Sequence, residues 1–332
     1  MLVKIGIPRA LLYYYYFPFW KAFFEALDME VVVSEETNKG ILNKGIKESV
    51  SEICVPIKLY IGHAIQLLNK EIDYIFVPRM VSIQSGEYFC PKFMGLPDML
   101  RHGVKGLEGK IITCQIKSDS DDISAPENYY PMAEVLGVTK EQIQVAASVA
   151  REQWIGFRMF NKSGFTAVEA MKMIQTNDSL EVLLNNQQSS KPVLRIGLIG
   201  YVYNIYDPFL NMNIIEKLRE LNVDFITFDM LEEAQLQEKI KDMEKTLFWT
   251  FSNKLLGAGL RLFHEPTIDG IIHLTAFGCG PDSFMGKLFE FESDQTGVPF
   301  MSIRVDEHTG ENHLQTRIEA FVDMLKRKKF IA

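Results

Sequence analysis

The segment Leu2–Pro8, LVKIGIP, has the apolar run and closing proline of a short buried strand that ends in a turn. An aromatic segment, Pro18–Leu27, follows it with the character of a helix, and the β-branched run Glu30–Ser34, EVVVS, predicts the next strand. Strand, helix and strand in this order open a parallel β-α-β unit. This opening decides the fold class that the rest of the chain extends.

The alternation of strand and helix continues through the first third of the chain. Helices are expected at about 39–52 and 56–68, with strands at Asp73–Pro78 (DYIFVP) and Lys110–Ile116 (KIITCQI). A long loop between 79 and 101 separates these two strands. The pattern predicts an α/β protein with a mostly parallel, doubly wound sheet.

The opening motif returns in the second half of the chain. Lys4–Ile7 (KIGI) matches Arg195–Leu198 (RIGL), and the strand that begins at Asp73 matches one that begins at Asp269. A loop containing a cysteine follows each of the latter two strands. A repeat of this length predicts two similar α/β domains.

Between the two halves the periodicity becomes helical, and the polar stretch 185–190, NNQQSS, is the best candidate for a linker. We therefore expect a first domain at 1–125, a helical connector and linker at 126–190, and a second domain at 191–332. The strand Pro299–Val305 (PFMSIRV) and a helix at about 314–328 complete the second domain.

Composition excludes several classes of function. The chain has 332 residues, of which 47% are hydrophobic, and a net charge of −8, which argues against a nucleic-acid-binding protein. No segment has the length and apolar character of a membrane span, and the N-terminus lacks the pattern of an export signal. The four cysteines then suggest a reducing compartment, so we expect a cytoplasmic protein.

Three cysteines lie where a parallel α/β sheet binds ligands, outside the carboxyl ends of its strands. Cys54 directly precedes a predicted helix, where the helix N-terminus favours a thiolate. Cys90 lies in YFCPK, and Cys279 lies between glycines in FGCGPD, where backbone N–H groups can approach a ligand. Cys114 lies within the strand KIITCQI, and we expect it to be a packed core thiol.

The residues leave the kind of site open. Three thiolates are one fewer than the usual set for a cubane iron–sulfur cluster, which would leave one iron open to water, substrate or a partner. Zinc with three protein ligands and water is the rival metal. The chain has no CxxC pair, so buried cysteines without any metal are a further interpretation.

Other side chains are weaker candidates for a role in the site. Arg9 follows the first strand, where it could hold an anion, and Lys58 lies shortly after Cys54. Lys92 and Asp282 flank the other two cysteines, and His308 follows the last strand, where a capped turn is the alternative. The aromatic run 13–16 fits the core packing of a helix better than a substrate cleft.

Nearly the whole chain resembles the 2-hydroxyacyl-CoA dehydratase and benzoyl-CoA reductase superfamily, most closely its activase-associated branch. Five segments carry the resemblance: KIGIPRALLYYYYFPFW, EICVPIKLYIGH, YFCPKFMGLPD, FGCGPDSF and DEHTGENHLQTRIEAF. It implies two Rossmann-like domains with a [4Fe-4S] cluster between them, held by Cys54, Cys90 and Cys279. It also implies a low-potential electron from an ATP-dependent activator that has its own iron–sulfur cluster, in anaerobic chemistry.

The chain departs from parts of this pattern. It has no GxxxxGK[ST] motif, so we do not expect it to hydrolyse ATP through a P-loop. An acyl-CoA pocket is not recognisable, although the resemblance implies a small-molecule substrate of that kind and a homo- or hetero-oligomer. We therefore expect an iron–sulfur reductase or dehydratase-like enzyme, and the alternative is a cluster-free two-domain protein that binds a small molecule.

Overall fold

The computed structural model describes residues 2–176, 180, 192–241 and 243–331, so the predicted linker at 185–190 lies outside the described residues. The chain divides into two compact units. Unit 1 comprises Met1–Arg158 and Leu247–Thr250, and unit 2 comprises Met159–Thr246 and Phe251–Ala332. The boundaries expected at 125 and 190 remain a prediction. Within the described residues, no helix combines the length and apolar character needed to cross a membrane.

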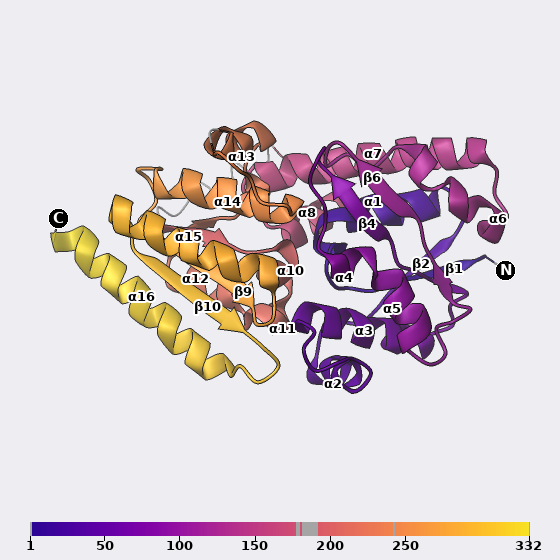
Figure 1. Ribbon diagram of the computed structural model, residues 1–332, viewed down its shortest axis with the longest axis horizontal. Helices are drawn as coiled ribbons and strands as arrows, with labels where there is room; N and C mark the ends of the chain where they lie inside the picture. The colour runs from indigo at the N-terminus through magenta and orange to yellow at the C-terminus, as the bar shows by residue number, and fades with distance from the viewer. Residues whose placement is uncertain (1, 177–179, 181–191, 242, 332) are drawn as a thin grey trace. The chain divides into compact units, whose positions relative to one another are not determined.

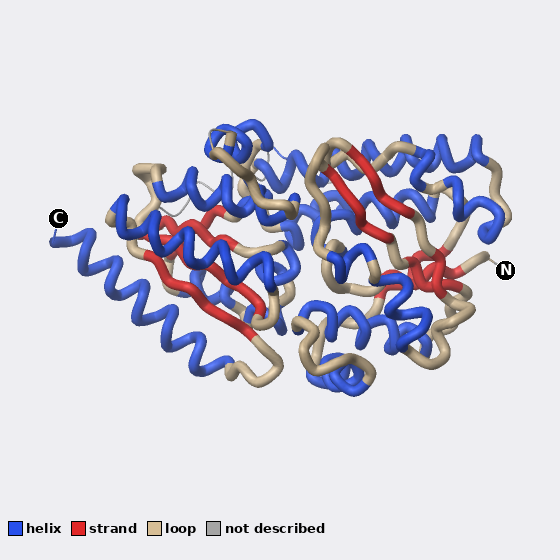
Figure 2. The backbone as a smooth tube through the Cα atoms, viewed as in Figure 1, coloured by secondary structure: helices blue, strands red, loops and turns tan. Residues whose placement is uncertain are grey.

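Unit 1 contains a four-stranded sheet in the order β2-β1-β3-β5, in which every pair of neighbours is parallel. Figure 1 labels β1 and β2 of this sheet, and Figure 2 draws the strands in red. Its elements alternate along the chain: β1 (Lys4–Ile7), α1 (Tyr13–Glu25), β2 (Glu30–Val33), α2 (Lys39–Lys47), α3 (Val55–Leu68), β3 (Tyr74–Phe76) and β5 (Ile111–Ile112). A smaller parallel sheet pairs β4 (Arg79–Ile83) with β6 (Gln115–Ser118).

Short helices and one long helix follow these strands. Unit 1 includes α4 (Pro91–Met94), α5 (Leu96–Gly103), η1 (Pro126–Asn128), η2 (Tyr130–Met132), α6 (Ala133–Leu136) and most of α7 (Lys140–Lys162). The helix α8 (Ala167–Thr176) belongs to unit 2. The described part of the predicted connector is therefore helical, as its periodicity indicated.

Unit 2 repeats the four-stranded parallel sheet, in the order β10-β9-β7-β8. Its strands are β7 (Leu194–Ile199), β8 (Val223–Ile226), β9 (Gly270–Ala276) and β10 (Phe300–Val305). Its helices are α10 (Val202–Tyr206), α11 (Pro208–Asn211), α12 (Ile214–Glu220), η3 (Phe228–Met230), α13 (Glu233–Ile240), α14 (Thr250–Phe263), α15 (Gly280–Thr296) and α16 (Glu311–Ile331). The α/β fold with parallel sheets is confirmed.

The internal repeat extends from strand order to single hydrogen bonds. Read from its other edge, the order in unit 2 is β8-β7-β9-β10, which corresponds to β2-β1-β3-β5 in unit 1. In unit 1 the Lys4 N–H donates to the Asp73 carboxylate at 2.8 Å, and in unit 2 the Arg195 N–H donates to the Asp269 carboxylate at 2.8 Å. An equivalent aspartate thus directly precedes the equivalent strand in each unit, β3 in unit 1 and β9 in unit 2.

Two expectations for unit 1 were wrong. The segment Lys110–Ile116 is not one strand, because it divides into β5 and β6, which belong to different sheets. The region 79–101 is not one long loop, because it contains β4, α4 and α5. Pro91 and Pro97, which suggested a loop, lie instead in the first turns of α4 and α5, where a missing N–H costs no helical hydrogen bond.

The core of unit 1 is built around the aromatic helix α1. This helix begins at Tyr13, five residues before the start that we expected at Pro18. All four tyrosines of the run 13–16 are buried, as core packing predicted. Tyr16 stacks on Trp154 of α7 with ring centroids 5.8 Å apart, and Phe23 packs on Tyr129 at 4.6 Å. Burial of this aromatic face stabilises the helix even though Pro18 lies inside it.

Helices α2 and α3 approach each other closely through two glycines. A Cβ atom at Gly45 would lie 1.7 Å from the Lys58 carbonyl oxygen, and one at Gly62 would lie 2.1 Å from the Ile41 carbonyl oxygen. Both obstacles are backbone atoms, which cannot move aside as a flexible side chain can. This contact fixes the helix whose N-terminus carries Cys54.

We predict that Gly45→Ala or Gly62→Ala lowers the free energy of unfolding by about 3 kcal/mol, because α2 and α3 must separate to admit the methyl group. Urea unfolding followed by circular dichroism measures this change. Gly103→Ala is the matched control, since nothing lies within 4 Å of its added Cβ; it should be neutral or stabilise by up to about 1 kcal/mol. Equal unfolding midpoints for all three variants would contradict the proposed close contact.

Candidate functional site

Each of the three candidate cysteines is the N-cap residue of a helix. Cys54 precedes α3, Cys90 precedes α4, and Cys279 precedes α15, each with an extended backbone and a proline in the first helical turn. Cysteine is not a usual N-cap residue, because its thiol accepts hydrogen bonds weakly. A thiolate at this position is stabilised by the free N–H groups and the positive end of the helix.

Cys54 is the best buried of the three, with 9% of its surface exposed. Its backbone carbonyl accepts from the Ile57 N–H at 3.0 Å, which closes the first turn of α3. Lys58 lies on the same turn and is 3% exposed, so an ammonium group is buried close in sequence to the thiol.

Cys90 is half-buried at the start of α4. Burial, as the largest effect, raises the pKa of the Cys90 thiol, and the charge of Cys54 raises it further. Hydrogen bonds from the backbone N–H groups of Phe93 and Lys92 lower this pKa, as does the Lys92 ammonium, but the net direction is upward. Both thiols belong to unit 1, and Cys90 lies within reach of the charge of Cys54.

Cys279 lies in unit 2, three residues after the end of β9, and is half-buried. Gly278 has φ of +76°, a conformation that favours glycine, and it turns the chain from the strand into α15. The Cys279 N–H donates to the Ala276 carbonyl at 3.2 Å, and the Ser283 N–H donates to the Cys279 carbonyl at 3.1 Å. The thiol therefore lies at the carboxyl end of a strand, as the sequence predicted.

Cys114 differs from the other three in surroundings as well as in position. We expected Cys114 inside a strand, and this was wrong. It lies between β5 and β6, where the chain passes from one sheet to the other. It is 2% exposed, and burial raises the pKa of its thiol well above the ordinary value. Its expected burial in the core is confirmed.

Within the described residues, no group of three or more His, Cys, Asp or Glu side chains is placed to bind a metal ion. The donors nevertheless suit an iron–sulfur cluster in kind, because all three are thiols at the N-caps of helices. Two of these thiols belong to unit 1 and one to unit 2.

Arg9 lies beyond the carboxyl end of β1, where we expected a residue able to hold an anion. Its backbone N–H donates to the Ser34 hydroxyl at 2.7 Å, and its guanidinium pairs with Glu36 at 3.1 Å. Ser34 in turn bonds to Nδ1 of His63 at 2.9 Å, and Nε2 of His63 bonds to the Thr37 hydroxyl at 3.0 Å. His63 thereby connects α3, the helix of Cys54, to the end of β2.

The weaker candidates have different surroundings. Lys92 is half-buried in α4, beside Cys90. Asp282, in the first turn of α15, is fully buried and bonds to His273 of β9. His308 lies in a capped turn, in which its N–H donates to Asp306 at 2.9 Å, so the alternative interpretation of this segment describes the structure. Burial would raise the pKa of Asp306, but bonds from Thr309 and His308 hold it below its ordinary value.

Two cavities of unit 2 show where else a ligand could bind. A cavity of about 350 Å³ after β10 is lined by His308, Arg304 and Arg317 among others. A larger one of about 610 Å³ lies along β8, and its three cations pair with carboxylates: Lys162 with Glu232, Arg195 with Asp224, and Arg219 with Glu169. Cys279 lines neither cavity.

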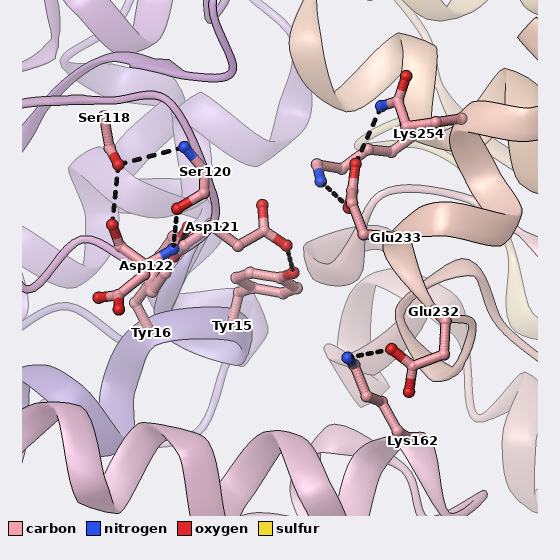
Figure 3. A network of polar contacts seen from close by, with 11 residues as sticks. Tyr15, Tyr16, Ser118, Ser120, Asp121, Asp122, Lys162, Glu232, Glu233 and Lys254 are labelled. Atoms are coloured by element: carbon pink, nitrogen blue, oxygen red, sulfur yellow. Dashed lines mark hydrogen bonds and ion pairs between the residues drawn. The ribbon is translucent and has the colours of Figure 1, made fainter. Parts of the chain in front are cut away.

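Figure 3 shows polar contacts that hold each unit's own elements together. In unit 1 the Tyr15 hydroxyl donates to Asp121 at 2.5 Å, which fixes α1 to the loop after β6. In unit 2 Lys254 of α14, which is buried, pairs with Glu233 of α13. The contact with Asp121 gives the Tyr15 hydroxyl a structural role in unit 1.

Sequence reasoning missed the side chains that anchor the cysteine loops. Arg79 of β4 donates to the Met94 carbonyl and to Asp98, and so fixes α4 and α5 behind Cys90. His273 anchors α15 through Asp282. The only signal for His273 was a polar residue within the apolar strand sequence GIIHLTA. Arg79 gave none beyond its position after the strand DYIFVP.

The buried His63 predicts a defined dependence of stability on pH. Burial, followed by the charge of Arg9, lowers the pKa of His63 to about 3, whereas an unfolded chain binds this proton near pH 6.5. Between these values the unfolded state holds more protons, so the free energy of unfolding falls as pH decreases, by about 1.4 kcal/mol per pH unit. His63→Gln should remove this dependence, so urea unfolding from pH 7 to pH 4 should show the wild type losing its advantage over the variant. A constant difference would contradict a neutral, buried His63.

Family models match the chain over nearly its whole length. A model described as the CoA enzyme activase uncharacterised domain matches residues 4–231, and one described as the 2-hydroxyglutaryl-CoA dehydratase D-component matches residues 188–325. No curated protein is detectably similar to this chain. A solved structure described as a phosphosugar isomerase from Silicibacter pomeroyi DSS-3 is 10% identical over 98% of this chain and 85% of that one, with a TM-score of 0.20, too low to carry an argument.

These matches confirm the resemblance that the cysteine segments indicated. The first model alone covers more than half of the chain, and its match includes Cys54 and Cys90. The match to the dehydratase component includes Cys279. The chain therefore belongs to the family of the CoA enzyme activase uncharacterised domain, within the superfamily of 2-hydroxyacyl-CoA dehydratases and activase-related proteins.

Proposed function

We propose that this chain is an iron–sulfur redox protein of the 2-hydroxyacyl-CoA dehydratase type, in which Cys54, Cys90 and Cys279 hold one [4Fe-4S] cluster. The observation that carries the proposal is the shared position of these thiols. Each is the N-cap of a helix with a proline in its first turn, whereas Cys114 is sealed in the core. Family membership supports the same assignment.

The surroundings of Cys90 act on its ionisation in opposite directions. The backbone N–H groups of Lys92 and Phe93 lower the pKa of Cys90, and donors of this kind tune a cluster's potential. The pKa of Cys90 is raised without a metal because burial and the charge of Cys54 oppose ionisation. A cation that binds both sulfurs removes that opposition, because it supplies the missing positive charge. When bound, such a cluster would supply a low-potential electron and one iron that no cysteine ligates.

Charged side chains near the thiols have supporting roles in this proposal. Lys58 is buried one turn after Cys54, and Lys92 lies beside Cys90, so both can balance the negative charge of a thiolate-bound cluster. Arg9, at the carboxyl end of β1, would hold an anionic group of a small substrate such as an acyl-CoA. Its guanidinium is already paired with the exposed Glu36, an ion pair that contributes little and can be exchanged for a ligand.

The proposed partner is an ATP-dependent activator with its own iron–sulfur cluster. The name of the family model that matches residues 4–231 refers to CoA enzyme activases, which supports an activase as the partner. This chain contains no GxxxxGK[ST] phosphate-binding motif, so ATP hydrolysis is assigned to the partner. Docking should be transient, because the partner must dissociate to be recharged, so a modest polar interface is expected.

We predict that Cys54→Ala, Cys90→Ala and Cys279→Ala each abolish stable iron binding, since the loss of one thiolate leaves only two ligands. Cys114→Ala is the matched control and should keep wild-type iron content, with a loss of stability from the core cavity only. Iron and acid-labile sulfide are measured after anaerobic purification, with circular dichroism to verify folding.

Full iron retention in Cys279→Ala, or iron loss in a folded Cys114→Ala protein, would contradict the ligand assignment. The same analysis distinguishes the rival sites. Zinc without sulfide would indicate a mononuclear metal site with the same thiols. Absence of both metals would favour a cluster-free small-molecule binding protein.

The role of the activator generates a separate prediction. The iron–sulfur centre of this chain should be reduced by the activator from the same organism in the presence of ATP, and far more slowly without it. Electron paramagnetic resonance after rapid freezing measures the reduced centre. Equally fast reduction by ferredoxin alone would contradict dependence on ATP and leave the ligand assignment intact.

A further inference from the structure

A fully buried hydrogen-bonded pair connects the strand before Cys279 to the helix after it. Nε2 of His273, in β9, lies 2.9 Å from Oδ1 of Asp282, in the first turn of α15, and both side chains are 0% exposed. The pair therefore joins two elements of unit 2 directly behind the turn that carries the thiol.

The surroundings of the pair are apolar. Phe289 meets the His273 ring edge-on at 5.3 Å between centroids, and Phe300 lies nearly parallel to it at 6.4 Å. Nδ1 of His273 and Oδ2 of Asp282 have no hydrogen-bond partner among the described residues. A buried polar pair with unsatisfied atoms is a poor source of stability, because apolar side chains of similar volume often stabilise a core as well or better.

The pair acts on the position of Cys279 through a very short connection. Only Phe277, Gly278 and Cys279 separate the end of β9 from the start of α15. Asp282 is the third residue of that helix, so a bond from Asp282 to the strand fixes where the helix begins. The N-cap residue must then lie at a defined place relative to the sheet edge.

We propose that His273 and Asp282 are positioning residues that hold the Cys279 thiol in the place where it ligates the cluster. The proposal has two parts. The first part, that the pair fixes the position of Cys279, concerns the metal-free protein and can be tested alone. The second part, that this position serves ligation of the cluster, rests on the proposed function.

Unit 1 offers an independent anchor that serves as a control. Arg79 of β4 donates to the Met94 carbonyl and to Asp98, which fixes α4 and α5 after Cys90. Asp98→Ala removes an ion pair of similar length, 2.8 Å, from behind a different cysteine. Its effects should remain in unit 1 and leave the region of Cys279 unchanged.

The test uses the full chain and three variants at the pair. Asp282→Ala removes the bond. Asp282→Asn keeps an oxygen that can accept from His273, so this variant should behave as the wild type does. The double variant His273→Leu/Asp282→Leu replaces the pair by apolar side chains, which a purely stabilising role would accept. Circular dichroism melting reports folding for each protein.

Two measurements are made on every variant. Amide hydrogen exchange of a peptide covering 277–285, in metal-free protein, reports how firmly the Cys279 turn is held. Retention of iron against a chelator, after anaerobic reconstitution, reports ligation. We expect Asp282→Ala and the double variant to exchange about tenfold faster in this peptide and to hold iron about tenfold or more weakly. Asp282→Asn and Asp98→Ala should match wild-type exchange there.

The positioning of Cys279 and its ligation of the cluster each have a result that would contradict them. Wild-type exchange at 277–285 in the folded double variant would overturn the positioning role, whether or not the protein binds iron. Faster exchange with unchanged iron retention would show that ligation does not need the pair, and would also overturn the proposal. If the wild type binds no iron, the proposed function fails, and the exchange data still judge the positioning role.

Discussion

The hydrogen bonds between Asp73 and Lys4, and their copies between Asp269 and Arg195, set the register on which both sheets depend. In each unit the aspartate carboxylate accepts from the partner strand's N–H, while its own N–H donates to the same residue's carbonyl. Because the strands are parallel, one register brings their carboxyl ends to one edge. Arg9 follows β1 there, and Cys279 follows β9.

Much of this arrangement could be predicted from the sequence. Short apolar runs such as LVKIGIP and EVVVS became β1 and β2, because such runs bounded by turn residues have few other ways to be buried. The turns around Pro91 and Pro97 could not be read correctly, since proline both ends loops and begins helices. The end of one strand before Cys114 and the start of the next could not be predicted, because the single apolar run KIITCQI contributes strands to two sheets.

The candidate site could be predicted only in part from the sequence, for a different reason. Cys54, Cys90 and Cys279 could be proposed as ligands because prolines or glycines lie close to them in the chain. Their anchors could not, since His273 meets Asp282 and Arg79 meets Asp98 only after β9 and β4 have packed against their helices. A similar limit applies to His63, whose partners Ser34 and Thr37 lie in the loop after β2. Contacts between elements leave little local pattern.

The central claim is that the three helix-capping cysteines hold an iron–sulfur cluster, and metal analysis of the anaerobically purified wild-type chain tests it most directly. The account predicts a brown protein with equimolar iron and acid-labile sulfide. A colourless protein that refolds normally but takes up neither iron nor sulfide on anaerobic reconstitution would contradict it, as would stoichiometric zinc without sulfide.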